Sequence, residues 1–196
     1  MHIEFKPWEI LDRNLFLSAR PWFEVWRERV RLPDGRVIPD YYQLVVPDAS
    51  VVVAITPEQE LLTLRQYKHG AGATIWGLPA GFCKNNEHPM DCAQRELLEE
   101  TGYQAQRWVA LGTYVRDANR GGGAVHAFLA LNARKVAEPN SDDLEEYRMQ
   151  CLTMVELLGL IRRRQIKPLG VIAAVLLAHL YLEDQNGAIP GMEGLA

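Results

Sequence analysis

The stretch GFCKNNEHPMDCAQRELLEETGY, residues 81–103, predicts a loop that runs into a helix. Pro89 suits a first helical position, Asp91 suits the positive end of the helix dipole, and Thr101-Gly102 supplies a stop signal. Apolar residues recur at three- and four-residue spacing and should face a core. These core-facing residues are Met90, Ala93 and Leu97.

Three carboxylates share another face of this predicted helix. Glu96, Glu99 and Glu100 lie at i, i+3 and i+4, near the negative end of the helix dipole, where they repel one another. A hard cation such as Mg²⁺ or Mn²⁺ would relieve that repulsion, because both ions prefer oxygen ligands. The alternative is a solvated acidic face whose charge is moderated by Arg95.

The complete spacing of the stretch is more specific than the helix alone. Gly81 is followed after five residues by Glu87, after seven more by Arg95-Glu96, and then by Glu99-Glu100 and Gly102. The pattern resembles the box of the Nudix hydrolase family at each defined position. The resemblance implies an α/β/α sandwich with a mixed sheet, in which a loop-helix-loop holds a divalent metal against a diphosphate linkage. Water then attacks phosphorus and splits a nucleoside diphosphate from a further group X.

The resemblance also implies a set of metal ligands. Glu96 and Glu100 correspond to the principal ligands, and Glu99 to a further or water-mediated ligand. The carbonyl of Ala80, just before the box, resembles a backbone ligand used by several members. The implied cofactor is Mg²⁺ or Mn²⁺, which would neutralise phosphate oxygens and activate bound water.

Other residues take positioning roles by the same resemblance. Arg95 corresponds to an orienting partner of a glutamate, and Glu87 to a tether between loop and helix. The segment R-Q-Y-K-H-G followed by L-P-A-G is similar to the lead-in of ADP-ribose and nucleotide-sugar pyrophosphatases. Arg65 in this segment is expected to approach a phosphate, unless it is only a solvated strand-end arginine. Arg120 is a second expected substrate contact.

The general base is expected in an acidic loop outside the box, as in other family members. Matching the strand that follows assigns this role to Glu145, with Asp143 and Glu146 as alternatives. A base must reach the attacking water, and a plain solvated acidic loop stays open as the other interpretation.

Two departures from the ADP-ribose pyrophosphatase pattern weaken ADP-ribose as the specific substrate. Gly77 stands where those enzymes usually carry a glutamate, two residues before the proline. Ala118 and Asn119 occupy the region where they characteristically have a proline. A nucleoside diphosphate joined to a sugar or similar group is therefore the expected substrate class.

Hydrophobic patterning predicts three regions along the chain. Residues 1–48 form a β-rich extension that contains a hairpin, with strands over 22–32 and 36–46. Residues 49–185 form the hydrolase domain, and 186–196 a flexible tail. The extension carries four aromatic residues that need a surface to cover: Trp22, Trp26, Tyr41 and Tyr42. By resemblance, it should help to build a homodimer and one wall of the substrate site. Filling of the hairpin by its own aromatic residues is the alternative.

Within residues 49–185, strands are expected at 50–56, 60–67, 108–115, 124–131 and 148–153. Helices are expected at 154–164 and 170–182, the second apolar around most of its circumference and therefore buried. The segment between the strands ending at 115 and starting at 124 should be a glycine-rich loop, whose backbone is either mobile or tightly approached, as near a ligand. A plain flexible hairpin loop is the alternative.

Composition excludes several other classes. The net charge of −4 gives no basis for nucleic-acid binding, and the apolar segment 170–182 is too short to span a membrane. Three cysteines without a close pair favour neither a disulfide framework nor a zinc site, and they fit the cytoplasm. A nucleotide-sugar-binding regulator without turnover stays as an alternative, although no appended DNA-binding unit is visible. An inert metal-binding scaffold stays as a second alternative, and the undamaged box argues against it. An isomerase similar to isopentenyl-diphosphate isomerase is the third, and the intact box and the ADP-ribose-like lead-in argue against it.

Overall fold

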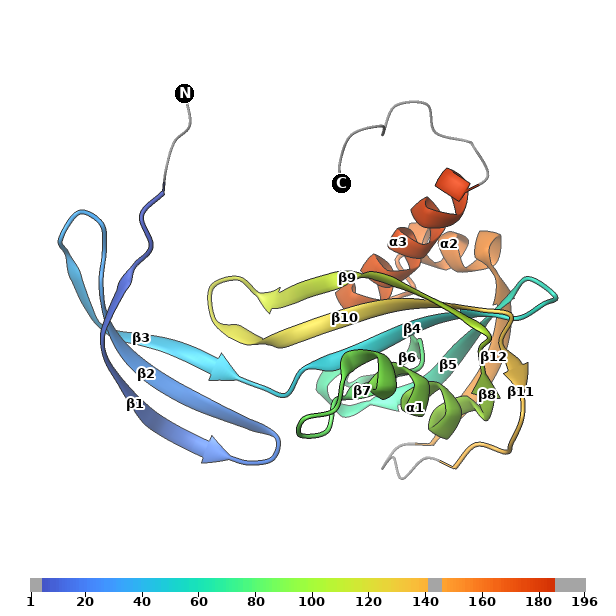
Figure 1. Ribbon diagram of the computed structural model, residues 1–196, viewed down its shortest axis with the longest axis horizontal. Coiled ribbons are helices and arrows are strands. Elements are labelled where there is room, and N and C mark those ends of the chain that lie inside the picture. Colours follow the sequence, from blue (N-terminus) through green and yellow to red (C-terminus); the bar gives the residue numbers. More distant parts are fainter. Residues whose placement is uncertain (1–4, 141–145, 186–196) are drawn as a thin grey trace. The chain divides into compact units, whose positions relative to one another are not determined.

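The computed structural model describes residues 5–140 and 146–185 and divides the chain into two compact units (Figure 1). The first unit comprises Met1–Asp48 with Val115–Ala124, and the second comprises Ala49–Tyr114 with Val125–Ala196. The expected extension, residues 1–48, is thus grouped with a segment from the middle of the chain. That segment is the tip of a long hairpin, which the sequence pattern had assigned to the hydrolase domain.

The first unit is built on a three-stranded antiparallel sheet. Strand β2 (Phe23–Arg31) pairs with β1 (Glu9–Ala19) on one side and with β3 (Val37–Val45) on the other. The predicted hairpin is therefore confirmed, but β1 adds a strand that it did not include. The exposed side chains of β1 show no clear alternation, so the binary pattern did not mark it.

The second unit contains a mixed sheet. Strand β10 (Gly121–Leu131) runs parallel to β4 (Ala49–Ile55), which pairs antiparallel with β5 (Glu60–Lys68), and β5 pairs antiparallel with β12 (Tyr147–Thr153). The long strand β9 (Arg107–Asp117) forms a hairpin with β10. The remaining elements are short: the 3-10 helix η1 (His69–Ala71) and the strands β6 (Ala73–Gly77), β7 (Ala80–Phe82), β8 (Tyr103–Gln104) and β11 (Arg134–Lys135).

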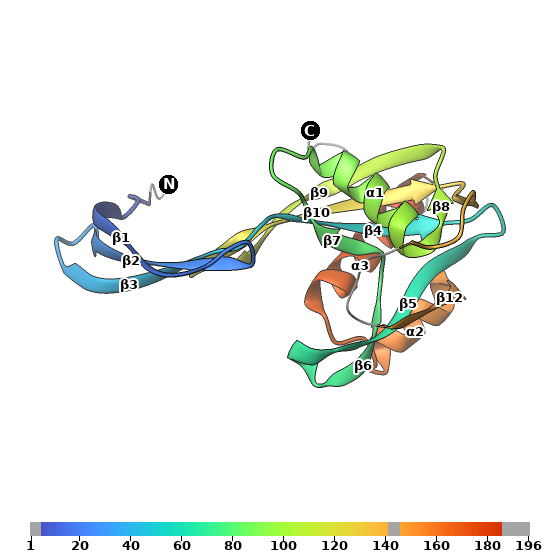
Figure 2. The same ribbon diagram turned by 90° about the horizontal axis from the view of Figure 1, so that it is seen from below.

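Helices cover both faces of this sheet. They are α1 (Pro89–Thr101), α2 (Met154–Arg162) and α3 (Leu169–Gln185). Figure 2 shows α1 on one side of the strands and α2 and α3 on the other. The fold is the expected α/β/α sandwich. No helix in the described part of the chain is long and apolar enough to cross a membrane.

The core follows from the alternation of side chains along β4. Val51, Val53 and Ile55 pack in one cluster with residues of α2 and α3. Val52 and Ala54 face the other way and pack with residues of α1. Because both faces are covered, the strand reads as a continuous apolar run, which is why it was recognisable in the sequence.

The expected glycine-rich loop is wrong. The three consecutive glycines lie within β10, at φ of +82°, +85° and +77° for Gly121, Gly122 and Gly123. A Cβ on Gly123 would lie 2.5 Å from the carbonyl oxygen of Val46. The glycines therefore allow backbone segments of the first unit to approach closely, and no ligand is needed to explain them.

The expected burial of the last helix is also only partly correct. Ala174, Val175 and Ala178 of α3 are buried, but Leu176 and Leu180 are 40% and 49% exposed. The sheet covers one side of α3 only, so an apolar circumference did not imply burial all round.

Candidate active site

Helix α1 begins and ends where the sequence predicts. The ring Nδ1 of His88 accepts a hydrogen bond from the backbone N–H of Met90 at 3.2 Å, and Pro89 occupies the first turn. Gly102 ends the helix in the left-handed conformation, with φ of +75°, and its N–H donates to the carbonyl of Leu98. These caps fix the helix relative to the loop before it.

Two glutamates of α1 converge on neighbouring residues of β7. The carboxylate of Glu96 lies against Gly81, where an added Cβ would be 2.1 Å from its Oε1. One helical turn later, Oε2 of Glu100 accepts a hydrogen bond of 2.8 Å from the backbone N–H of Ala80. Glu100 is 3% exposed. Two acidic groups are thereby held at one strand, partly withdrawn from water.

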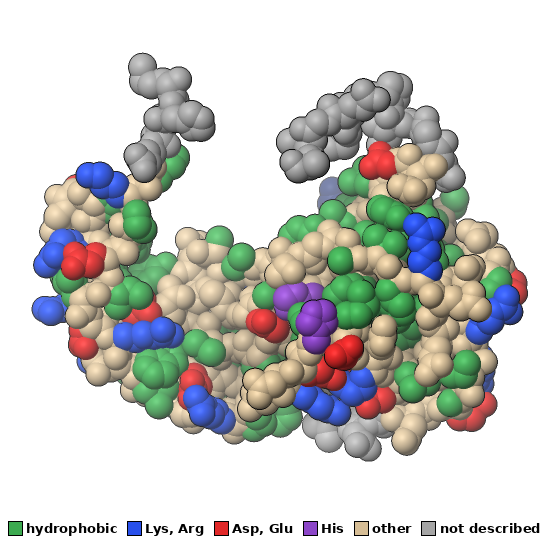
Figure 3. All heavy atoms as spheres, viewed as in Figure 1, with side chains coloured by type: hydrophobic (Ala, Val, Ile, Leu, Met, Phe, Trp, Pro, Cys, Tyr) green, Lys and Arg blue, Asp and Glu red, His purple; other side chains and the backbone are tan. Residues whose placement is uncertain are grey.

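Arg95 binds the remaining carboxylates of the box. Its guanidinium donates to both oxygens of Glu87, at 2.8 and 2.9 Å, to Glu96 at 2.6 Å and to Glu99 at 2.9 Å. The bond to Arg95 lowers the pKa of Glu87 to about 2, and the same contacts raise the pKa of Arg95. Figure 3 shows charged side chains of both signs next to one another over α1. Glu87 thus ties the loop to the helix through Arg95.

The donor chemistry at this place suits a hard cation. Glu96 and Glu100 offer carboxylate oxygens, and Gly81 leaves the space in which the first of them lies. Within residues 5–140 and 146–185, no group of three or more His, Cys, Asp or Glu is already gathered as a metal site. Arg95 relieves part of the repulsion among the carboxylates that the cation was expected to relieve, because it donates hydrogen bonds to Glu96 and Glu99. Arg95 thus moderates the charge of the acidic face, as the alternative expected, but Glu100 on this face is buried rather than solvated.

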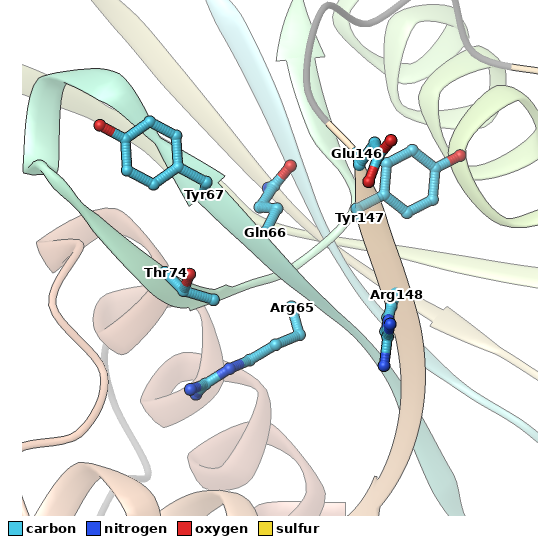
Figure 4. Close-up of a pocket in the computed structure, with 7 residues that line it drawn as sticks. All are labelled: Arg65, Gln66, Tyr67, Thr74, Glu146, Tyr147 and Arg148. Carbon is cyan, nitrogen blue, oxygen red and sulfur yellow. The ribbon is translucent and has the colours of Figure 1, made fainter.

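A cavity of about 740 Å³ lies at the ends of β5, β6 and β12 (Figure 4). Arg65, expected to approach a phosphate, lines it, with its guanidinium 4.8 Å from the ring centroid of Trp76. Glu146, one of the three alternatives for the general base, lines it as well. The full lining consists of Arg65, Gln66, Tyr67, Thr74, Glu146, Tyr147 and Arg148.

The remaining candidates for the general base and for a substrate contact lie outside the described residues or in the first unit. Glu145 and Asp143 lie outside the described residues. Arg120 belongs to the first unit, where its guanidinium lies 3.5 Å from the carboxylate of Asp117. The backbone N–H groups of Asn119 and Arg120 also bond to Asp117, and these bonds lower the pKa of its carboxyl group.

Comparison with known proteins decides the family. The model of the NUDIX domain matches residues 46–171. The chain belongs to the Nudix family. This Nudix hydrolase is 29% identical over 145 residues to the ADP-ribose pyrophosphatase of Bacillus subtilis (strain 168), which covers 73% of the chain and 77% of that protein. It is 30% identical over 161 residues to the ADP-ribose pyrophosphatase of Mycobacterium tuberculosis, which covers 80% of the chain and 76% of that protein.

A solved structure shares the fold of this Nudix hydrolase. The crystal structure of an ADP compounds hydrolase superposes with a TM-score of 0.82, covering 96% of this chain and 100% of that one. The sequence identity between the two is 19%, so the match supports the fold alone.

Sequence reasoning named only Arg65 and Glu146 among the residues that line the cavity in this Nudix hydrolase, and it missed Arg148 and Gln66. Arg148 reads as an ordinary polar position of β12, and only the strand register places it opposite Arg65. Gln66 is 6% exposed, and its Oε1 has no hydrogen-bond partner within the described ranges. The sequence signal for Gln66 was a polar residue within the apolar pattern of β5. That signal does not reveal which strand pairs with β5 there.

Proposed function

We propose that this Nudix hydrolase is a Mg²⁺-dependent pyrophosphohydrolase. Its substrate is a nucleoside diphosphate linked to a sugar or similar group, of which ADP-ribose is the model. The products are a nucleoside monophosphate and a phosphorylated X. The observation that carries the proposal is the position of two box carboxylates beside strand β7. The Glu96 carboxylate lies against Gly81, and the Glu100 carboxylate accepts a hydrogen bond from the N–H of Ala80. The names of the two ADP-ribose pyrophosphatases support the substrate class.

Glu96, Glu100, Glu99 and the carbonyl of Ala80 would hold Mg²⁺ or Mn²⁺. The bound ion supplies charge neutralisation at the diphosphate and lowers the pKa of water. The protein's contribution is position: burial of Glu100 and the bond from Ala80 fix its carboxylate before substrate arrives. Arg95 orients Glu96 and Glu99.

Arg65 binds a substrate phosphate in this proposal. Stacking on Trp76 holds its guanidinium in one orientation, which reduces the entropy lost on binding. The base that accepts a proton from the attacking water comes from the segment that contains Glu145, Asp143 and Glu146. The described member of this set, Glu146, lines the cavity with Arg65. Arg120 stays a proposed substrate contact.

The hydrolase is proposed to act as a homodimer in the cytoplasm. Its first unit exposes large apolar side chains that a partner could cover, among them Phe16 at 62% and Trp22 at 64%. The three cysteines, Cys83, Cys92 and Cys151, are free thiols, in keeping with a reducing compartment.

The proposed reaction is tested by phosphate release from a panel of nucleoside diphosphate sugars, with Mg²⁺ and an added phosphatase. The wild type should hydrolyse ADP-ribose or a near analogue. Glu100→Gln keeps the size of the side chain and an acceptor for Ala80, but it loses the charge, so kcat/KM should fall by about 100-fold or more. Glu58→Gln, an exposed turn residue, is the matched control and should keep full activity. Full activity of Glu100→Gln would contradict the metal assignment.

A further inference from the structure

Two arginines occupy paired positions on adjacent strands that line the cavity. Arg148 of β12 is the direct register partner of Arg65 of β5, so their side chains leave the same face of the sheet. Cβ atoms of such partners lie about 5 Å apart, and like charges placed this way are destabilising. Figure 4 shows Arg65 and Arg148 on these two adjacent strands, with the Arg65 side chain extending away from β12.

Neither guanidinium forms an ion pair with an acid of the described residues. The ion pairs there involve other basic residues, and the contact recorded for Arg65 is with the ring of Trp76. The lining of the cavity holds two arginines and one acid, Glu146, which makes its formal charge +1. On a protein whose net charge is −4, a repulsive basic pair at a cavity calls for an anionic ligand.

The geometry points to Arg148 as a substrate-positioning residue that, together with Arg65, binds the diphosphate of a nucleoside diphosphate. This inference deepens the proposed function and rests on it for the identity of the substrate. Guanidinium groups suit phosphate oxygens because their donors form a planar fork. A phosphate between the two arginines would turn a repulsive pair into two charge-assisted contacts.

The inference separates binding from folding. Removing Arg148 should weaken binding of the phosphates, yet it should also relieve the repulsion with Arg65. Arg148→Gln is therefore expected to keep or raise the Tm while it loses affinity. A residue with a merely structural role would lower the Tm and affinity together.

The experiment is calorimetric titration of ADP into the full chain with EDTA present, so that it does not depend on metal or turnover. Arg148→Gln should bind ADP about 10- to 100-fold more weakly than the wild type, the effect of losing one charge-assisted contact. Arg148→Lys should bind with intermediate affinity, because it keeps the charge but not the fork. Arg162→Gln, an exposed arginine of α2, is the control and should bind as the wild type does.

Two further measurements locate the effect. Adenosine has no phosphate, so its affinity should be the same in the wild type and in Arg148→Gln. In a double-mutant cycle, Arg65→Gln and Arg148→Gln should be coupled, since both contact one ligand. Unchanged ADP affinity in Arg148→Gln, equal losses for ADP and adenosine, or a Tm that falls together with affinity would each overturn the inference. Tight, Arg148-dependent binding of ADP by a protein that hydrolyses nothing on the panel would instead remove the proposed reaction and leave the phosphate subsite standing.

Discussion

Gly81 is glycine for a steric reason that involves a proposed metal ligand. The Glu96 carboxylate occupies the space in which any side chain at position 81 would begin. The box spacing could reveal this pairing of glycine and glutamate only by family resemblance, because the contact depends on how α1 lies against β7. Local sequence rules reach the helix face but not its partner strand.

Replacing Gly81 with alanine should therefore move Glu96. A Cβ at 2.1 Å from Oε1 cannot be accommodated, so the carboxylate must rotate away. Misplacement by about 1 Å at a reacting centre can cost about 100-fold in rate, and kcat/KM on ADP-ribose should fall accordingly. Gly70→Ala serves as the control, because nothing lies within 4 Å of a Cβ there. Equal activities of the two variants would show that activity does not require the Glu96 carboxylate to lie against Gly81.

Gly77, the departure noted in the sequence, is explained by its neighbour. A Cβ at this position would lie 3.1 Å from Nε2 of Gln66, a contact tighter than ordinary packing. The buried amide of Gln66 thus fills the space beside Gly77. The contact between Gln66 and Gly77 depends on the register of β5 and β6. The sequence alone therefore showed that the glutamate is missing, but it could not show that Gln66 lies in its place.

Restoring the glutamate should destabilise the protein. Gly77→Glu overpacks the site against Gln66, which typically costs about 1–3 kcal/mol, and adds a charge beside a buried amide. Thermal and urea unfolding would measure this loss. The second change Gln66→Ala should recover part of it by making room. A Gly77→Glu variant as stable as the wild type, with no gain from the second change, would show that Gln66 does not restrict this position.

Among the helices and strands, the sequence predicted those whose ends or burial are determined by their own residues. Helix α1 was predictable because Pro89 and Gly102 mark its ends, and β4 because it is buried on both faces. The length of β9 and β10 was not predictable, since three glycines read as a loop until β3 and the chain after it approach them. The exposed side of α3 likewise depends on what packs beside it.

The bridge between loop and helix gives a pH prediction. The folded state lowers the pKa of Glu87 to about 2, from an ordinary value near 4.5, chiefly through its bond to Arg95. A lowered pKa stabilises the fold above the unfolded value, and that contribution is lost as the pH falls from about 4.5 towards 2. Glu87→Gln removes the charge, so its stability should be lower at neutral pH and should change less over this acid range.

Unfolding in urea at pH values from neutral to acid would measure the difference. The stability gap between the wild type and Glu87→Gln should be constant above the unfolded pKa and narrow below it. Glu58→Gln, at an exposed turn, is the control and should follow the wild type. A gap that stays constant down to the lowest pH would show that the Arg95 bond does not set the titration of Glu87.

At the scale of the whole molecule, the first unit carries an apolar surface that its own strands leave open. Aromatic pairs Phe16–Tyr42 and Trp8–Tyr41 involve adjacent residues of β3, whose side chains point to opposite faces. Large apolar side chains exposed on both faces of a small sheet are typical of a surface that binds another protein. This is the physical basis for expecting a second copy of the chain to cover it.

The wild type should therefore sediment as a dimer that dissociates on dilution, and Phe16→Glu should shift it towards monomer. Phe16 is 62% exposed in the single chain, so the charge should cost little in the monomer but would be buried in a dimer. Val155→Glu, at a 77% exposed position of α2 in the other unit, is the matched control and should stay dimeric. If the wild type stays monomeric at high concentration, the exposed sheet needs another explanation. If both variants stay dimeric, the interface lies elsewhere, because a buried glutamate without a partner is not tolerated in an apolar contact.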